Sequence, residues 1–260
     1  MLARYAPARK GIAPKNKATL RRFTEARIQA LVDLPDQILR EVNREVQKRR
    51  ESYRSAHGVL PKPVEMFDAG LVKQIMLALA THIMLARAPR RSNLSCLRLD
   101  WIRWREGLAT LEIPPAFVKG RRAQDGPLLI PLDGKASRLL DQYLQALRAK
   151  ILHAEDSRNP YLFPSPPHAG RHRIGGCYDS LPDRLVDQVH ERVGVRINPH
   201  LWRHLIGWIW LREDPDKLAA VQKLLGHKNI QTTIDYYADI DESVVLNEWL
   251  GYLDGKKKKA

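Results

Sequence analysis

The most apolar stretch of the chain, DAGLVKQIMLALATHIMLARA at residues 68–88, limits what the chain can fold into. It has the length of a helix, and Pro89 follows it directly, where helical structure stops. No segment of the chain reaches the roughly 18 consecutive apolar residues that a membrane span needs. We therefore expect a central helix that is buried in the core of a folded domain.

The residues around this helix predict further helices and one small sheet. Three short segments, CLRLDWIRW, GLATLEIPP and GPLLIPL, are separated by glycines and charged turns, which is typical of antiparallel strands. The remaining apolar periods are helical, apart from a long loop at residues 155–178 that is rich in Pro, Gly, His and Arg. The expected helices cover residues 24–34, 35–53, 135–152, 181–193, 198–213, 216–226, 229–238 and 242–253. The pattern predicts a mainly α protein with a three-stranded antiparallel sheet (α+β).

The charge of the chain favours a polyanionic partner. Formal net charge is +15 over 260 residues, so the partner is either nucleic acid or an anionic membrane surface. Residues 1–19 have no apolar period and are predicted to form an extended basic arm, and Lys256–Lys259 form a basic tail. Cys96 and Cys177 do not lie in a C-x-x-C pair, so we expect Cys96 to fill core space in a reducing cytoplasm.

Four short motifs carry candidate chemistry: APRRSNL (88–94), FVKGRR (117–122), HLWRH (200–204) and LLGHKNIQTTIDYY (224–237). His200 and Arg203 are three residues apart, so on a helix they lie on one face and reach one ligand. Gly226 is expected to end a helix, which leaves His227 in a turn and Tyr236 nine residues further on. Each motif alone also fits a surface pair or a simple helix hairpin.

Taken together, these motifs resemble the active site of the tyrosine recombinases, or phage integrase family. That family has an H-x-x-R box, then an L-G-H box, and a nucleophilic tyrosine nine positions after the second histidine. RRSNLSCLRL from Arg90 is similar to its R-x-S-E-L-x-x-L box, and VKGR at 118–121 stands where it has a lysine on a strand hairpin. The resemblance extends over residues 24–253 and implies the catalytic-domain fold of that family.

The resemblance implies a role for each residue in cleaving DNA through a 3′-phosphotyrosine link. Tyr236 is the nucleophile, Arg90 and Arg203 hold the charge that develops on the phosphate, and Lys119 protonates the leaving 5′ oxygen. His200 and His227 contact the same phosphate. Further DNA contacts are expected from Arg91, Arg121, Arg122 and Lys228. No metal or other cofactor is required, because the arginines supply the positive charge.

Two features depart from the family pattern. Asn93 stands where the family commonly has an acidic residue that supports the arginine and the histidine. Only residues 1–23 precede the catalytic domain at 24–253, so we expect either a fragment without the usual N-terminal DNA-clamping domain or a basic arm that replaces part of it. Residues 254–260 are the basic tail.

Several alternatives stay open on the sequence alone. A DNA-binding remnant of a mobile element without turnover would carry the same motifs, and a type IB topoisomerase is disfavoured by the short chain. His168, His172 and Cys177 lack a second ligand pair, so a DNA-facing loop is preferred there over a metal site.

The expected partners are double-stranded DNA and further copies of the chain in a tetrameric assembly. Helix 242–253 is expected either to pack onto a neighbouring copy and so hold the assembly together, or to pack in cis on its own chain. A bacterial or phage origin is expected.

Overall fold

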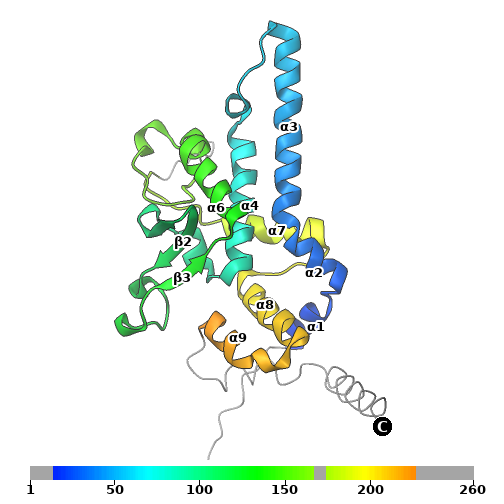
Figure 1. Cartoon of the computed structure of the whole chain (residues 1–260), viewed down its shortest axis with the longest axis vertical. Coiled ribbons are helices and arrows are strands. Elements are labelled where there is room, and N and C mark those ends of the chain that lie inside the picture. The colour runs from blue at the N-terminus through cyan, green and yellow to red at the C-terminus, as the bar shows by residue number, and fades with distance from the viewer. Residues whose placement is uncertain (1–13, 167–173, 227–260) are drawn as a thin grey trace, which may run out of the picture. The chain divides into compact units, whose positions relative to one another are not determined.

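The computed structural model describes residues 14–166 and 174–226, and they fall into two compact units. The larger unit is Phe23–His200, and the smaller one joins the chain up to Arg22 with the chain from Leu201 onward. Figure 1 labels the elements of both units, each of which is described by itself below.

The central helix of the larger unit is α4 (Ala69–Arg87), as the apolar stretch predicted. Asp68 caps its first turn by accepting a hydrogen bond from the Leu71 amide at 2.8 Å, and most of its side chains are buried. It packs against α3, α6, α7 and β3. Within the described part of the chain, α4 alone is long and apolar enough to cross a membrane, but 61% of that window is buried in the protein. It therefore behaves as a core helix.

Helices α2 (Glu25–Val32) and α3 (Leu34–His57) precede α4 along the chain. Ile38, Val42 and Val46 lie on one buried face of α3, in the positions that the helical period predicted. α3 and α4 run side by side (Figure 1). Residues 51–60, at the far end of this pair, are all exposed, so the last turns of α3 add little to the core.

The sheet has three antiparallel strands in the order β1 (Ile102–Arg105), β2 (Leu108–Ile113) and β3 (Leu128–Pro131). A two-residue turn joins β1 to β2, with φ of 51° at Glu106 and 76° at Gly107, as a tight hairpin with two positive φ angles requires. On β2 the buried residues alternate, so one face of the sheet covers the core. The predicted fold class is thereby found in the structure.

The rest of the larger unit closes the core around α4. Helix α6 (Gly134–Gln142) continues into a π-helical turn at Tyr143–Leu147 and a 3-10 turn at Arg148–Ile151, over the range predicted as one helix. α7 (Leu181–Val193) also lies at its predicted place, and the short α5 (Arg91–Ser95) follows α4 directly.

The smaller unit contains α1 (Pro14–Arg21), most of α8 (Pro199–Glu213) and α9 (Leu218–Leu225). The prediction that residues 1–19 are an extended arm is wrong for the part that the structure describes, because α1 is helical from Pro14. Among residues 15–21 of this helix, whose burial the structure describes, Leu20 alone is buried. One buried apolar side chain on so short a helix produces no periodic pattern that a sequence-based prediction could detect.

The two cysteines form a disulfide bond, which corrects the expectation that Cys96 only fills core space in the reduced state. Cys96 follows α5 and Cys177 lies 81 residues later, before α7, with 5.3 Å between their Cα atoms. This separation is in the usual range for a disulfide. The pairing depends on the path of the chain between the two residues, which no spacing rule predicts.

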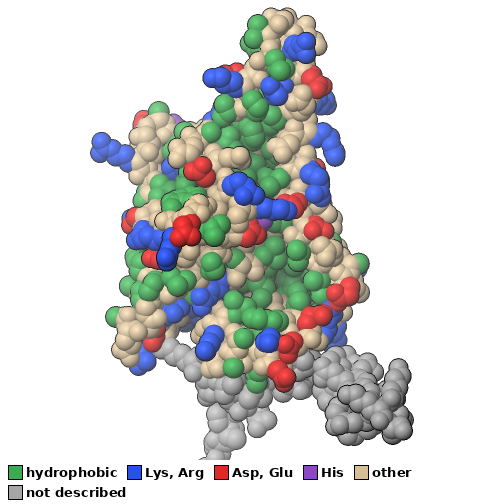
Figure 2. All heavy atoms as spheres, viewed as in Figure 1, with side chains coloured by type: hydrophobic (Ala, Val, Ile, Leu, Met, Phe, Trp, Pro, Cys, Tyr) green, Lys and Arg blue, Asp and Glu red, His purple; other side chains and the backbone are tan. Residues whose placement is uncertain are grey.

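Charged side chains of both signs are mixed on the face shown in Figure 2, and hydrophobic side chains gather along the α3–α4 pair. Ion pairs contribute to this mixing. Arg49 contacts Glu45 and Asp68, Lys135 contacts Asp36 at 2.9 Å, and Arg192 contacts Glu41 at 2.6 Å. The large net charge is therefore not gathered into one basic surface on this face.

Candidate active site

Arg90 lies at the point where the chain leaves the buried α4 helix. Ala88 ends α4 in the left-handed conformation with φ of 44°, and after Pro89 the backbone of Arg90 is extended. The exposed Arg90 side chain then donates a hydrogen bond from Nη1 to the Lys119 backbone oxygen at 3.0 Å. It has no carboxylate partner among the residues that the structure describes. Within the described residues, therefore, no carboxylate neutralises the positive charge of Arg90.

Arg91 is engaged differently from its neighbour. Its Nη1 and Nη2 donate to the two carboxylate oxygens of Asp183 on α7 at 2.5 and 2.6 Å. The carboxylate raises the pKa of Arg91, and the guanidinium holds the pKa of Asp183 below its usual range. Arg91 thus fastens α5 to α7, although the sequence predicted it as a DNA contact. Asp183 was missed because it lies 92 residues away and belongs to no motif.

Asn93 connects α5 to the segment between β2 and β3. Its side chain is only 6% exposed, and its Nδ2 donates a hydrogen bond to the Phe117 backbone oxygen at 2.7 Å. The sequence predicted a supporting role for Asn93 beside the arginine and the histidine. In the structure its amide holds the backbone two residues before Lys119.

The segment between β2 and β3 carries Lys119 and the two arginines after it. The Lys119 side chain is exposed, and Gly120 follows with φ of 82°, a turn conformation that favours glycine. Arg121 donates from Nη2 to the Asp125 backbone oxygen at 3.0 Å, and Arg122 lies 3.7 Å from the Asp125 carboxylate. The larger unit therefore brings Arg90, Asn93 and the Lys119 turn together.

The smaller unit carries the second half of the predicted site. The Arg203 guanidinium donates from Nη2 to the backbone oxygen of Leu225, the last residue of α9. Gly226 then ends α9 in the left-handed conformation, as predicted. On α8, Arg203 thus points toward the start of the L-G-H box. His200, the last residue of the larger unit, is exposed on the first turn of the same helix.

Several predicted residues lie outside the part of the chain that the structure describes. These are His227, Lys228, Tyr236, Tyr237 and the segment 242–253, together with His168 and His172. Of the metal candidates, Cys177 is described. With Cys96 and Asp179 it forms a group of three potential metal ligands whose ligand atoms lie within 4.8 Å of one another. No other group of three or more His, Cys, Asp or Glu residues within 14–166 and 174–226 meets this distance. The two sulfurs are bonded to each other there.

Comparison with known families resolves the identity of the fold. The sequence profile of the Phage integrase family matches residues 65–243, which is more than half of the chain and includes every predicted catalytic residue. The chain belongs to the phage integrase family. The predicted membership and the predicted fold are both confirmed.

Known relatives of this phage integrase family member cover parts of the chain. Tyrosine recombinase XerD of Listeria innocua is 30% identical over 169 residues, which are 64% of this chain and 50% of that protein. Transposase A from transposon Tn554 of Staphylococcus aureus is 37% identical over 82 residues, which are 32% of this chain and 22% of that protein. The chain thus spans half or less of the length of these two relatives.

A solved structure shows the same fold. The XerH site-specific recombinase, in a post-cleavage complex with its palindromic difH substrate, superposes with a TM-score of 0.52 at 18% sequence identity. The match covers 82% of this chain and 52% of that protein. It supports the catalytic-domain fold of a mainly helical chain with one small sheet.

Proposed function

We propose that this chain is the catalytic part, residues 24–253, of a site-specific DNA recombinase. It cleaves a DNA strand and rejoins it to another strand through a covalent 3′-phosphotyrosine intermediate. The observation that carries the proposal is the position of Arg90, an exposed cation without a carboxylate partner in the described residues, beside the turn that holds Lys119. Membership of the family over residues 65–243 supports it.

The proposed reaction exchanges one phosphodiester for another. The Tyr236 phenolic oxygen attacks the phosphorus, the bond from phosphorus to the 5′ oxygen breaks, and Lys119 gives that oxygen a proton. Tyrosine has an ordinary pKa of about 10, so few molecules hold a phenolate at neutral pH and nearby cations must activate it. Arg90 and Arg203 stabilise the charge on the non-bridging oxygens.

The histidines complete this arrangement. His200 and His227 donate hydrogen bonds to the phosphate, and His200 helps to remove the phenolic proton. Attack on the phosphotyrosine by the 5′ hydroxyl of a partner strand reverses the first step and restores a phosphodiester. The chemistry needs no external energy source, because each step replaces one phosphate ester by another.

The proposed substrate is double-stranded DNA, and the proposed location is the bacterial cytoplasm. A net charge of +15 favours phosphate contacts, so affinity should fall steeply as salt is added. Arg121, Arg122 and Lys228 are proposed to contact the DNA backbone. Strand exchange requires two DNA duplexes, and we propose self-association of the chain on DNA through segment 242–253.

Trapping the covalent intermediate tests this function. The protein is incubated with a pool of nicked duplexes of randomised sequence, in which the short cleaved fragment diffuses away, and adducts that resist detergent are recovered. Wild type and Tyr237→Phe are expected to give an adduct at Tyr236, located by mass spectrometry, and Tyr236→Phe none. Arg90→Ala is expected to lose the adduct, whereas Arg91→Ala retains it. A wild-type protein that binds the pool but gives no adduct would indicate a DNA-binding remnant instead.

A further inference from the structure

A cavity of about 240 Å³ lies beside α5, the short helix that directly follows Arg90. Its lining combines aromatic rings with polar side chains. The lining residues are Ser92, Asn93, Cys96, Arg98, Trp101, Phe117 and Tyr161. Drug-sized ligands occupy pockets of roughly 300–1,000 Å³, so this cavity suits one small flat ring rather than a longer molecule.

Three aromatic side chains form the walls of the cavity. The ring centroids of Trp101 and Phe117 lie 5.0 Å apart at an interplanar angle of 52°. Trp101 is buried, but 58% of Phe117 is exposed although it is a large apolar residue. An exposed phenylalanine at the edge of an aromatic cavity offers a stacking surface for a flat ligand.

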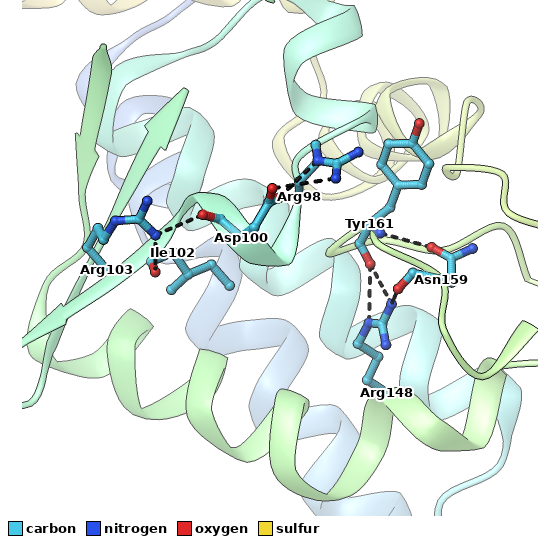
Figure 3. Close-up of polar contacts among 7 residues, drawn as sticks. All are labelled: Arg98, Asp100, Ile102, Arg103, Arg148, Asn159 and Tyr161. Atoms are coloured by element: carbon cyan, nitrogen blue, oxygen red, sulfur yellow. Dashed lines mark hydrogen bonds and ion pairs between the residues drawn. The ribbon is translucent and has the colours of Figure 1, made fainter. Parts of the chain in front are cut away.

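Tyr161 faces the cavity from a rigid backbone. Its backbone nitrogen donates to Asn159 Oδ1 at 2.9 Å, and its backbone oxygen accepts a hydrogen bond from Arg148 at 2.7 Å. Figure 3 shows that the Tyr161 ring points away from these contacts, on the side where the Arg98 guanidinium lies. Asp100 accepts a hydrogen bond from Arg98 Nε at 2.9 Å and so orients that guanidinium. The Tyr161 backbone and the Arg98 guanidinium are therefore held in place before any ligand arrives.

Asn93 supplies a hydrogen-bond acceptor to the same cavity. Its Nδ2 is used by the Phe117 backbone oxygen, which leaves the side-chain oxygen without a hydrogen-bond partner in the described residues. The acceptor therefore favours a ligand with an N–H group in the plane of its ring.

We propose that this cavity binds one unpaired nucleobase of the DNA strand whose phosphate is held by Arg90. The proposal rests on the proposed function. Asn93 is three residues after Arg90, which is about one helical turn, so a phosphate at Arg90 lies within one nucleotide of the cavity. The aromatic walls stack on the base, and the Asn93 oxygen accepts from the exocyclic amino group of cytosine or adenine. Thymine has no exocyclic amino group and offers only its ring N3–H to the Asn93 oxygen, so it binds less well.

Short duplexes with one bulged residue test the proposal. Fluorescence anisotropy measures the affinity of the full chain for a duplex with a bulged cytosine, a bulged thymine or a bulged abasic residue, and for a fully paired duplex. Stacking of one base on aromatic side chains strengthens binding by roughly 5- to 150-fold. We expect the bulged cytosine to bind about tenfold more tightly than the abasic bulge, with thymine between them.

Two variants show whether the cavity causes this preference. Phe117→Ala is expected to bring the ratio of affinities for cytosine and abasic bulges close to one. Trp104→Ala is the matched control, because Trp104 is 45% exposed on β1 but does not line the cavity, so its ratio stays at the wild-type value. Equal affinity for the two bulges with retained binding to paired DNA overturns the cavity proposal alone. Equal losses in the two variants also overturn it, and no binding to any duplex overturns both proposals.

Discussion

Replacing Asn93 by aspartate removes one hydrogen-bond donor from the junction between α5 and the segment after β2. In the wild-type chain, Asn93 Nδ2 donates to the Phe117 backbone oxygen at 2.7 Å from a side chain that is 6% exposed. The Asn93→Asp change keeps the size of the side chain and introduces the acidic type that the family commonly has at this position. It also points a carboxylate oxygen at a carbonyl oxygen.

The expected loss follows from these two facts. Leaving a buried polar group without its partner costs about 1–3 kcal/mol, and a buried, unpaired charge adds to that cost. We therefore expect Asn93→Asp to lower the free energy of unfolding by about 2–4 kcal/mol at pH 8. Burial and the Phe117 oxygen both disfavour the charged carboxylate, so its pKa in the folded protein is raised.

The sign of the pH dependence is a sharper test than the size of the loss. A raised pKa in the folded state contributes stability at low pH that is lost as the pH rises through that pKa. A protonated carboxyl group also donates a hydrogen bond to the Phe117 oxygen. The difference between Asn93→Asp and wild type should therefore shrink as the pH is lowered.

Urea unfolding of both proteins at pH 8 and pH 5, followed by tryptophan fluorescence, measures these differences. The matched control is Asn43→Asp, which makes the same chemical change at an exposed position on α3. Its effect should stay within about 0.5 kcal/mol, as is usual for a surface substitution. If the two variants lose equal stability, or if the loss at Asn93 grows on acidification, the assigned hydrogen bond does not hold the junction.

Three further predictions concern other groups. Asp183→Asn should lower the free energy of unfolding by at most about 1 kcal/mol, because the ion pair with Arg91 is half exposed. The pKa of Asp183 is lowered in the folded protein, so urea titrations should show that wild type loses this advantage as the pH falls through that pKa. Burial lowers the pKa of His82, so the melting temperature of wild type should decrease as the pH is lowered beyond about 6.5. His82→Gln should weaken this dependence of the melting temperature on pH. Reduction by dithiothreitol should lower the melting temperature to that of Cys177→Ser. The Cys96–Cys177 bond closes a long loop and so restricts the unfolded chain, which stabilises the folded state by about 4–5 kcal/mol in the chain-entropy estimate. Equal melting temperatures with and without reductant would contradict this.

Local pattern predicted most of the secondary structure of this chain. The apolar run at residues 68–88 became α4, and Ile38, Val42 and Val46 occupy the buried face that a period of 3.6 residues requires. Glycines and charged residues between short apolar segments indicated the three strands. Helix α1 escaped prediction because a single buried leucine makes no period.

The candidate site was predictable only in its residue types and their spacing. In the R-R pair at 90–91, motif spacing alone favoured Arg90. The structure adds that Asp183 pairs with Arg91, whereas Arg90 has no carboxylate partner among the described residues. Likewise, no motif indicates that the amide of Asn93 binds a backbone oxygen 24 residues away. Such contacts depend on how the chain returns on itself.

Side-chain periodicity and motif spacing act over a few residues along one element, so they were enough to predict most of the helices, the small sheet and membership of the phage integrase family. Only the tertiary structure decided which arginine stays available for a phosphate, which residues line the cavity at α5, and which cysteines pair. These properties arise between residues that are 24 to 92 positions apart, where the path of the backbone rather than local preference sets the distance.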